Sequence, residues 1–117
     1  AHFNLGNILK DLGKFKESEL FYRKAIEIQP NYAEAYSNLG TLLNDIGKLN
    51  EAEFAYRKAI EIKPDLAEAH SNLGNILRDL GKFQDAIFFY RKAIEIKPDF
   101  AEAKLNLEIL LNDHLIL

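Results

Sequence analysis

Apolar side chains recur along this chain at the spacing of amphipathic helices, in segments separated by glycine and proline. Between residues 49 and 62 the apolar stripe consists of Leu49, Ala52, Tyr56, Ala59 and Ile60. Between residues 33 and 46 the core-facing positions are Tyr36, Leu39, Gly40 and Leu43. We therefore predict helices over 33–46 and 49–62, with a left-handed turn residue at Gly47 between them and Pro64 ending the second.

This helix pair repeats every 34 residues. Residues 33–66 and 67–100 are identical at 23 of 34 positions. The residues that superpose at this offset include Gly6, Gly40 and Gly74, then Gly13, Gly47 and Gly81, and then Pro30, Pro64 and Pro98. Each first helix is preceded by an Asn or Asp three residues before a Glu, which predicts capping boxes at Asn31–Glu34, Asp65–Glu68 and Asp99–Glu102. A fixed period of this length is typical of a solenoid of stacked repeats.

The signature of each unit resembles the tetratricopeptide repeat (TPR). The matching residues of the second unit are Tyr36, Leu39, Gly40, Leu43, Ala52, Tyr56, Ala59 and Pro64. The resemblance implies an all-α fold, a right-handed TPR solenoid of antiparallel helix pairs. We expect one domain over residues 1–117, composed of a truncated repeat (1–32), two full repeats (33–66 and 67–100) and a terminal helix (101–117). The truncated first repeat and the absence of methionine predict that the chain is a segment of a longer protein.

An asparagine recurs two residues before the repeated glycine of each first helix, and these asparagines form the candidate binding site. In a TPR stack the first helices line a concave groove, and Asn4, Asn38, Asn72 and Asn106 are expected to form a ladder along it. An Asn side chain offers one acceptor and two donors, so it can pair with both the C=O and N–H of one peptide group. The flanking peptide-binding candidates are Asn7, Thr41, Asn44, Asp45, Asn75, Arg78 and Asp79.

This ladder resembles the one that holds extended peptides in the TPR superhelix of O-GlcNAc transferase. An alternative interpretation is that the asparagines bond to neighbouring helices and set the pitch of the stack. The TPR clamp of chaperone co-factors is a poorer match, because Phe3, Glu68 and Asn72 occupy the places of its basic residues. We therefore do not expect binding of a chaperone C-terminal carboxylate.

The predicted groove is acidic. Its acids are Glu34, Glu68, Glu102, Asp11, Asp45, Asp79 and Asp113, and only Lys10 and Arg78 oppose them. The four aspartates sit in the last turn of their helices, where negative charge opposes the helix dipole, and this favours a functional interpretation. We expect a partner segment that is neutral or basic.

Two further surfaces are unusually apolar. Leu20, Phe54 and Phe88 recur on the second helices, where either the helix is rotated so that they pack or they form an exposed stripe. The terminal helix, predicted from Ala101 to about Asp113, lacks the small glycine because Glu108 replaces it. The apolar residues predicted to form an oligomer interface on it are Leu105, Ile109, Leu115 and Ile116.

Composition and charge argue against several classes of function. The net charge of −3 gives no general electrostatic reason for binding nucleic acid or an anionic membrane. No arrangement of residues predicts a metal, a cofactor or a nucleophile, so we expect no enzyme activity. The absence of cysteine fits a reducing compartment, and we predict a cytoplasmic location.

The predicted function is a non-catalytic module that holds an extended peptide through the asparagine ladder. The alternatives are an assembly module that forms a homodimer through its terminal helix, and the substrate-recruiting arm of a larger transferase.

Overall fold

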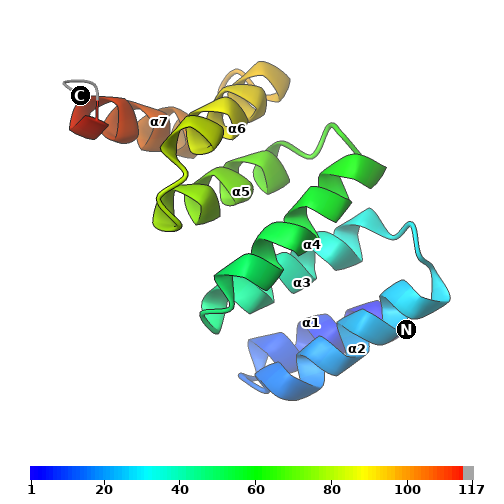
Figure 1. Ribbon diagram of the computed structural model, residues 1–117. Coiled ribbons are helices and arrows are strands. Elements are labelled where there is room, and N and C mark those ends of the chain that lie inside the picture. The colour runs from blue at the N-terminus through cyan, green and yellow to red at the C-terminus, as the bar shows by residue number, and fades with distance from the viewer. Residues whose placement is uncertain (115–117) are drawn as a thin grey trace. The chain divides into compact units, whose positions relative to one another are not determined.

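The computed structural model describes residues 1–114, which form seven α-helices and no strand (Figure 1). The helices are α1 (His2–Asp11), α2 (Phe15–Ile28), α3 (Ala33–Asp45), α4 (Leu49–Ile62), α5 (Ala67–Asp79), α6 (Phe83–Ile96) and α7 (Ala101–His114). The predicted all-α fold is confirmed. The predicted bounds of α4 agree with the structure, and those of α3 and α7 differ by one residue at the C-terminal end.

The chain forms two compact units, Ala1–Pro64 and Asp65–Leu117. In the first unit α2 packs against both α1 and α3, α4 packs against α3, and α1 also contacts α3. The first helices α1 and α3 therefore make one layer, and the second helices α2 and α4 make the other. In the second unit α6 packs against α5 and α7, which also contact each other. The single domain and the right-handed superhelix stay predictions.

The glycine turn after each first helix has the predicted left-handed backbone. Gly13, Gly47 and Gly81 have φ values of 78°, 83° and 79°. At the end of α3 the Gly47 N–H donates to the Asn44 carbonyl at 3.0 Å, and the Lys48 N–H donates to the Leu43 carbonyl at 2.8 Å. These two bonds form a Schellman motif, which satisfies carbonyls that the helix leaves unpaired. The turn thus requires glycine for its positive φ.

The capping boxes predicted at Asn31 and Asp65 are wrong. Helices α3 and α5 begin with Tyr32 and Leu66 at the N-cap, and neither helix has a side-chain cap hydrogen bond. The Glu34 carboxylate instead lies 3.9 Å from the Lys63 ammonium, in an exposed pair of the kind that contributes little stability. The physical reason for the error is a shift of one residue, because an apolar side chain occupies the capping position.

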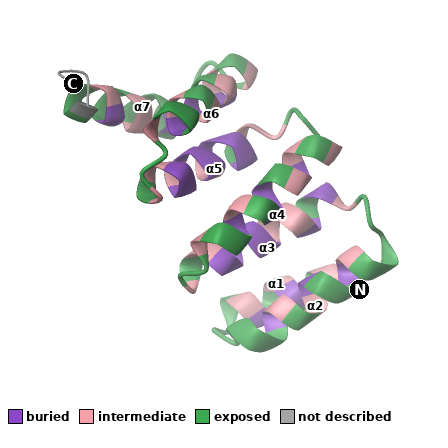
Figure 2. Ribbon diagram, in the orientation of Figure 1, coloured by how far each residue is buried: buried purple, intermediate pink, exposed green. Residues whose placement is uncertain are grey.

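The core of each repeat is built around a tyrosine packed on a glycine. Tyr22 and Tyr90 are fully buried, within the buried stripe on each helix pair (Figure 2). A Cβ atom placed on Gly74 would lie 2.7 Å from the Tyr90 ring, and one on Gly6 would lie 2.8 Å from the Tyr22 ring. Both distances are too short for a carbon–carbon contact. The repeated glycine is therefore small because the tyrosine ring lies directly against the helix backbone.

Candidate functional site

A chain of hydrogen bonds links the candidate groove residues of the first unit. The Asn38 amide on α3 donates from Nδ2 to Asn7 Oδ1 on α1 at 2.8 Å. The Tyr22 hydroxyl on α2 donates to the same Asn7 oxygen. We call this arrangement the tyrosine–asparagine relay. It ties the first helix of one repeat to its own second helix and to the first helix of the next repeat.

The second unit contains the same relay. The Tyr90 hydroxyl donates to Asn75 Oδ1 at 2.6 Å, and Asn106 Nδ2 donates to that oxygen at 3.1 Å. In the middle repeat Thr41 stands at the position of Asn7 and Asn75, and its hydroxyl shares a hydrogen bond with the Tyr56 hydroxyl. The relay was not predicted from the sequence. The recurrence of the tyrosine with a polar residue at this position was the available signal.

The relay supports the interpretation that the asparagines bond to neighbouring helices and set the pitch of the stack. It nevertheless uses only some of the hydrogen-bonding groups of the ladder asparagines. Asn38 and Asn106 each donate one N–H and retain a second N–H and the carbonyl oxygen. Within residues 1–114, the side chains of Asn4, Asn44 and Asn72 form no hydrogen bond. Asn4 is exposed, whereas Asn38, Asn72 and Asn106 are half-buried. The peptide-binding role of these residues stays a prediction.

Burial raises the pKa of the two relay tyrosines above the ordinary value of 10.0. For Tyr22, the nearby polar side chains of Ser18 and Asn38 oppose the effect of burial. For Tyr90, the positive charge of Arg78 opposes it, whereas the negative charge of Asp79 adds to it. The neutral hydroxyl is therefore the form that the folded protein favours.

These shifts predict a loss of stability at high pH. The unfolded chain has the lower tyrosine pKa, so the stabilising effect is complete below about pH 10 and disappears as the pH rises through the folded pKa. Urea unfolding between about pH 9 and pH 12 measures this, with Tyr22→Phe/Tyr90→Phe as the reference that removes both hydroxyls. We expect the free energy of unfolding to fall more steeply in the wild type than in this variant. Identical slopes would contradict the assignment.

The acidic residues of the candidate groove are accessible. All seven predicted acids are exposed, whereas Arg78 is half-buried and engaged. Arg78 lies 3.3 Å from the Asp79 carboxylate and donates to the Tyr90 hydroxyl, also at 3.3 Å. One of the two opposing cations is therefore used inside the second unit. The acidic groove and its neutral or basic partner stay predictions.

The terminal helix exposes part of its predicted interface. Leu105 and Ile109, one helical turn apart, are 56% and 46% exposed. Leu110 on the same helix is buried, so α7 does have a core face. Leu115 and Ile116 lie outside the described residues. Self-association through this helix stays a prediction.

Among the described residues there is neither a membrane-spanning helix nor a metal site. No helix within residues 1–114 is long and apolar enough to cross a bilayer. In the same part of the chain, no group of three His, Asp or Glu side chains is arranged to hold a metal ion.

The fold, with its repeated helix pairs and repeated polar face, defines a helical-repeat protein-interaction module. The chain belongs to the tetratricopeptide repeat family, which it matches over residues 1–65 and again over residues 67–100. As a class, TPR domains are non-catalytic and bind proteins or peptides. No curated protein sequence matches the chain.

Solved structures of TPR proteins superpose on almost the whole chain. A crystal structure of MamA is 28% identical with a TM-score of 0.92, and it covers 96% of this chain and 66% of its own. The first TPR domain of Spaghetti (RPAP3), bound to the HSP90 peptide SRMEEVD, is 22% identical with a TM-score of 0.92, over 96% of this chain and 89% of its own. O-GlcNAc transferase from Thermobaculum terrenum is 28% identical with a TM-score of 0.85, over 94% of this chain and 21% of its own. The chain thus spans less than two thirds of the MamA and transferase chains.

Proposed function

We propose that this TPR module holds an extended segment of a partner protein along its first-helix face, and that Asn38 and Asn72 bind the backbone of that segment. The segment is neutral or basic. Backbone binding supplies affinity for extended peptides in general, and the side chains between the asparagines supply selectivity.

One observation carries this proposal. The ladder amides keep an N–H donor and a carbonyl acceptor, which can pair with the C=O and N–H of a partner's peptide group. Asn38 uses a single N–H in the relay, which leaves one donor and one acceptor. Asn72 uses neither within the described residues. A pair of hydrogen bonds to one peptide group needs one donor and one acceptor, and each bond contributes roughly 0.5–1.5 kcal/mol.

The similar structures support a peptide ligand in general terms. The RPAP3 domain was solved with a bound HSP90 peptide, but at 22% identity it shares only the fold with this chain. That peptide, SRMEEVD, is acidic. In this chain Phe3, Glu68 and Asn72 stand where the clamp of chaperone co-factors has basic residues. We therefore propose a ligand that is neutral or basic and not acidic.

Peptide charge provides the experiment that tests this function. Three peptides of about 12 residues, a length that reaches several ladder positions at roughly 3.3 Å per residue, would share one sequence except for Lys, Gln or Glu at four sites. We expect the Lys peptide to bind most tightly and the Glu peptide most weakly, as measured by fluorescence anisotropy at low salt. Asp45→Asn is expected to reduce the preference for Lys about two- to fivefold.

The matched control for Asp45 is Asp85→Asn, an exposed aspartate on the second helix α6. It should leave the preference unchanged. Tighter binding of the Glu peptide would refute a groove selective for neutral or basic segments, and no binding of any peptide would refute the proposed function itself.

The second candidate function is self-assembly through α7, which is favoured by the exposed Leu105 and Ile109. It is distinguished from groove binding by sedimentation velocity over a range of concentrations. End-to-end association raises the sedimentation coefficient with concentration, whereas a groove that binds other proteins leaves it constant. Serine at both positions should abolish any such increase.

A third candidate is that the chain recruits substrates for a larger transferase. The 28% identity to an O-GlcNAc transferase over 94% of this chain favours it, although this region is only 21% of that protein. The sequence on either side of this chain tests it, because the candidate requires a catalytic domain there. The cytoplasmic location stays a prediction.

A further inference from the structure

A pocket opens on the second-helix layer of the first unit, on the opposite layer from the asparagines. Its volume is about 470 Å³, within the range of roughly 300–1,000 Å³ that is typical of ligand pockets. Tyr36, Leu39 and Leu43 of α3 line it together with Ile26 of α2 and Phe54 and Ala55 of α4. The lining is mainly apolar.

Two of the residues that line the pocket differ from their equivalents in the other repeats. At the position of Ala55 on α4, the first repeat has Phe21 and the third has Phe89. Phe21 stacks on His2 with ring centroids 5.9 Å apart, and Phe89 stacks on His70 at the same distance.

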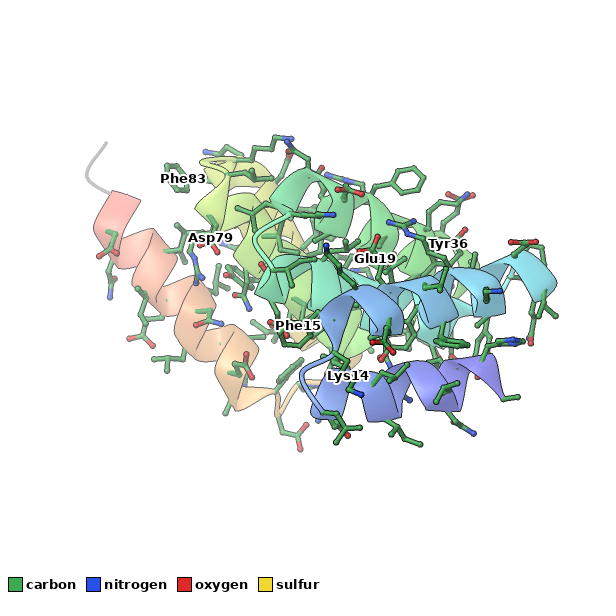
Figure 3. The ribbon with its side chains drawn as sticks, turned by 90° about the horizontal axis from the view of Figure 1, so that it is seen from below. Lys14, Phe15, Glu19, Tyr36, Asp79 and Phe83 are labelled. Carbon is green, nitrogen blue, oxygen red and sulfur yellow. The ribbon has the colours of Figure 1, made fainter. Side chains whose placement is uncertain are left out.

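In the second repeat the residue that corresponds to these histidines is Tyr36, labelled in Figure 3. Where the other repeats have the stacking phenylalanine, this repeat has Ala55. Tyr36 and Ala55 both line the pocket. The pocket therefore lies beside the position at which the other two repeats carry a benzyl side chain.

An exposed aromatic residue stands beside this space. Phe54 lines the pocket and is 63% exposed. The equivalent residues of the other repeats, Leu20 and Phe88, are 52% and 55% exposed, so the apolar stripe on the second helices is exposed. The packed interpretation of these three residues is wrong, because each side chain is more than half exposed. An aromatic ring that enters the pocket would contact Tyr36 on one side and Phe54 on another.

The charges around the pocket favour a basic ligand. Arg23 lies at the rim, but it already pairs with Glu19 at 2.9 Å and lies 3.5 Å from Glu51. Glu27 also lines the rim, is exposed, and has no cationic partner among residues 1–114. The rim acids thus exceed the available cations, which complements a Lys or Arg next to the bound ring.

We propose that this pocket is a second binding site, which takes an aromatic side chain from a partner protein with a basic residue adjacent to it in the partner sequence. The incoming ring occupies the space that Phe21 and Phe89 occupy in the other repeats. The site is distinct from the asparagine ladder, because no ladder asparagine lines it.

Short peptides test this site in the full chain. The probes are acetyl-Lys-Phe-Lys-amide, the same peptide with Ala in place of Phe, and acetyl-Glu-Phe-Glu-amide, followed by NMR chemical shifts. We expect the Phe peptide to bind at least about tenfold more tightly than the Ala peptide, since burial of a Phe side chain contributes about 1.5–3 kcal/mol. Its ring current should shift the Ala55 methyl resonance. The Glu peptide should bind about two- to fivefold more weakly than the Lys peptide.

Ala55→Phe is the decisive variant. It restores the residue of the other repeats, so we expect an equal or higher melting temperature and loss of binding of the Phe peptide. Phe54→Ala should weaken binding several-fold, while the control Phe88→Ala, similarly exposed on α6, should not. Unchanged binding to Ala55→Phe, or equal binding of the Phe and Ala peptides, would overturn the proposal. A marked loss of stability in Ala55→Phe would also overturn it, because the space would then not fit an aromatic ring.

Discussion

Replacement of Tyr90 by alanine is expected to lower the free energy of unfolding by about 3–5 kcal/mol, the range for truncation of a large buried aromatic side chain. Tyr90 is fully buried, and its ring lies against the Gly74 backbone. Its hydroxyl also donates to Asn75 Oδ1 at 2.6 Å. The substitution therefore leaves a cavity between α5 and α6 and removes a member of the relay. Urea unfolding followed by circular dichroism measures the loss.

Two variants on the same helix separate the sources of this effect. Phe88→Ala removes a side chain of similar size that is 55% exposed, and it should change stability by no more than about 0.5 kcal/mol. Tyr90→Phe keeps the ring and removes only the hydroxyl, for an expected cost of about 1–2 kcal/mol. An equal cost for Tyr90→Ala and Phe88→Ala would show that the tyrosine–glycine contact is not what holds the helix pair together.

The fold could be predicted because each repeat contains residues that mark the ends of its helices. Glycine at positive φ, proline after the second helix, and an apolar stripe at helical spacing each specify a local feature without reference to the rest of the chain. The bounds of α4 and the left-handed Gly47 were therefore predicted correctly. The capping boxes were not, because the choice between Asn31 and Tyr32 as the N-cap depends on how the preceding turn packs.

The site was less predictable, because its features depend on contacts between residues far apart in the sequence. The helical period places Asn38 on one face, but it does not show that Asn7 and Tyr22 converge there. The proposed pocket is lined by Ala55, where the ring that the other two repeats carry is absent. That absence is visible when the repeats are aligned, but its meaning follows only from the stacking seen in the other two repeats.

The Asn38→Ala/Asn72→Ala double variant is expected to lose at least tenfold in affinity for extended peptides. It removes up to four hydrogen bonds to the peptide backbone, at roughly 0.5–1.5 kcal/mol each. The Lys peptide of about 12 residues described above serves as the ligand. Asn38→Ala also removes one bond of the relay, so the melting temperature is measured in parallel to show that the variant remains folded.

The matched control is Gln84→Ala, which truncates an exposed side-chain amide on the second helix α6. It changes the same chemical group on the opposite layer and should leave the affinity of this peptide unchanged. A similar loss for both variants would indicate a non-specific effect of removing a surface amide, and not binding through the first-helix face.

The measurement that tests backbone binding most directly is a scan of the Lys peptide in which each backbone nitrogen is methylated in turn. Methylation removes one peptide N–H and leaves every side chain in place. We predict that at least one methylated peptide binds the wild type several-fold more weakly than the parent peptide does, and that this difference disappears in Asn72→Ala. If methylation at every position weakens binding to the wild type and to Asn72→Ala by the same factor, Asn72 does not bind the peptide backbone and the ladder is purely architectural.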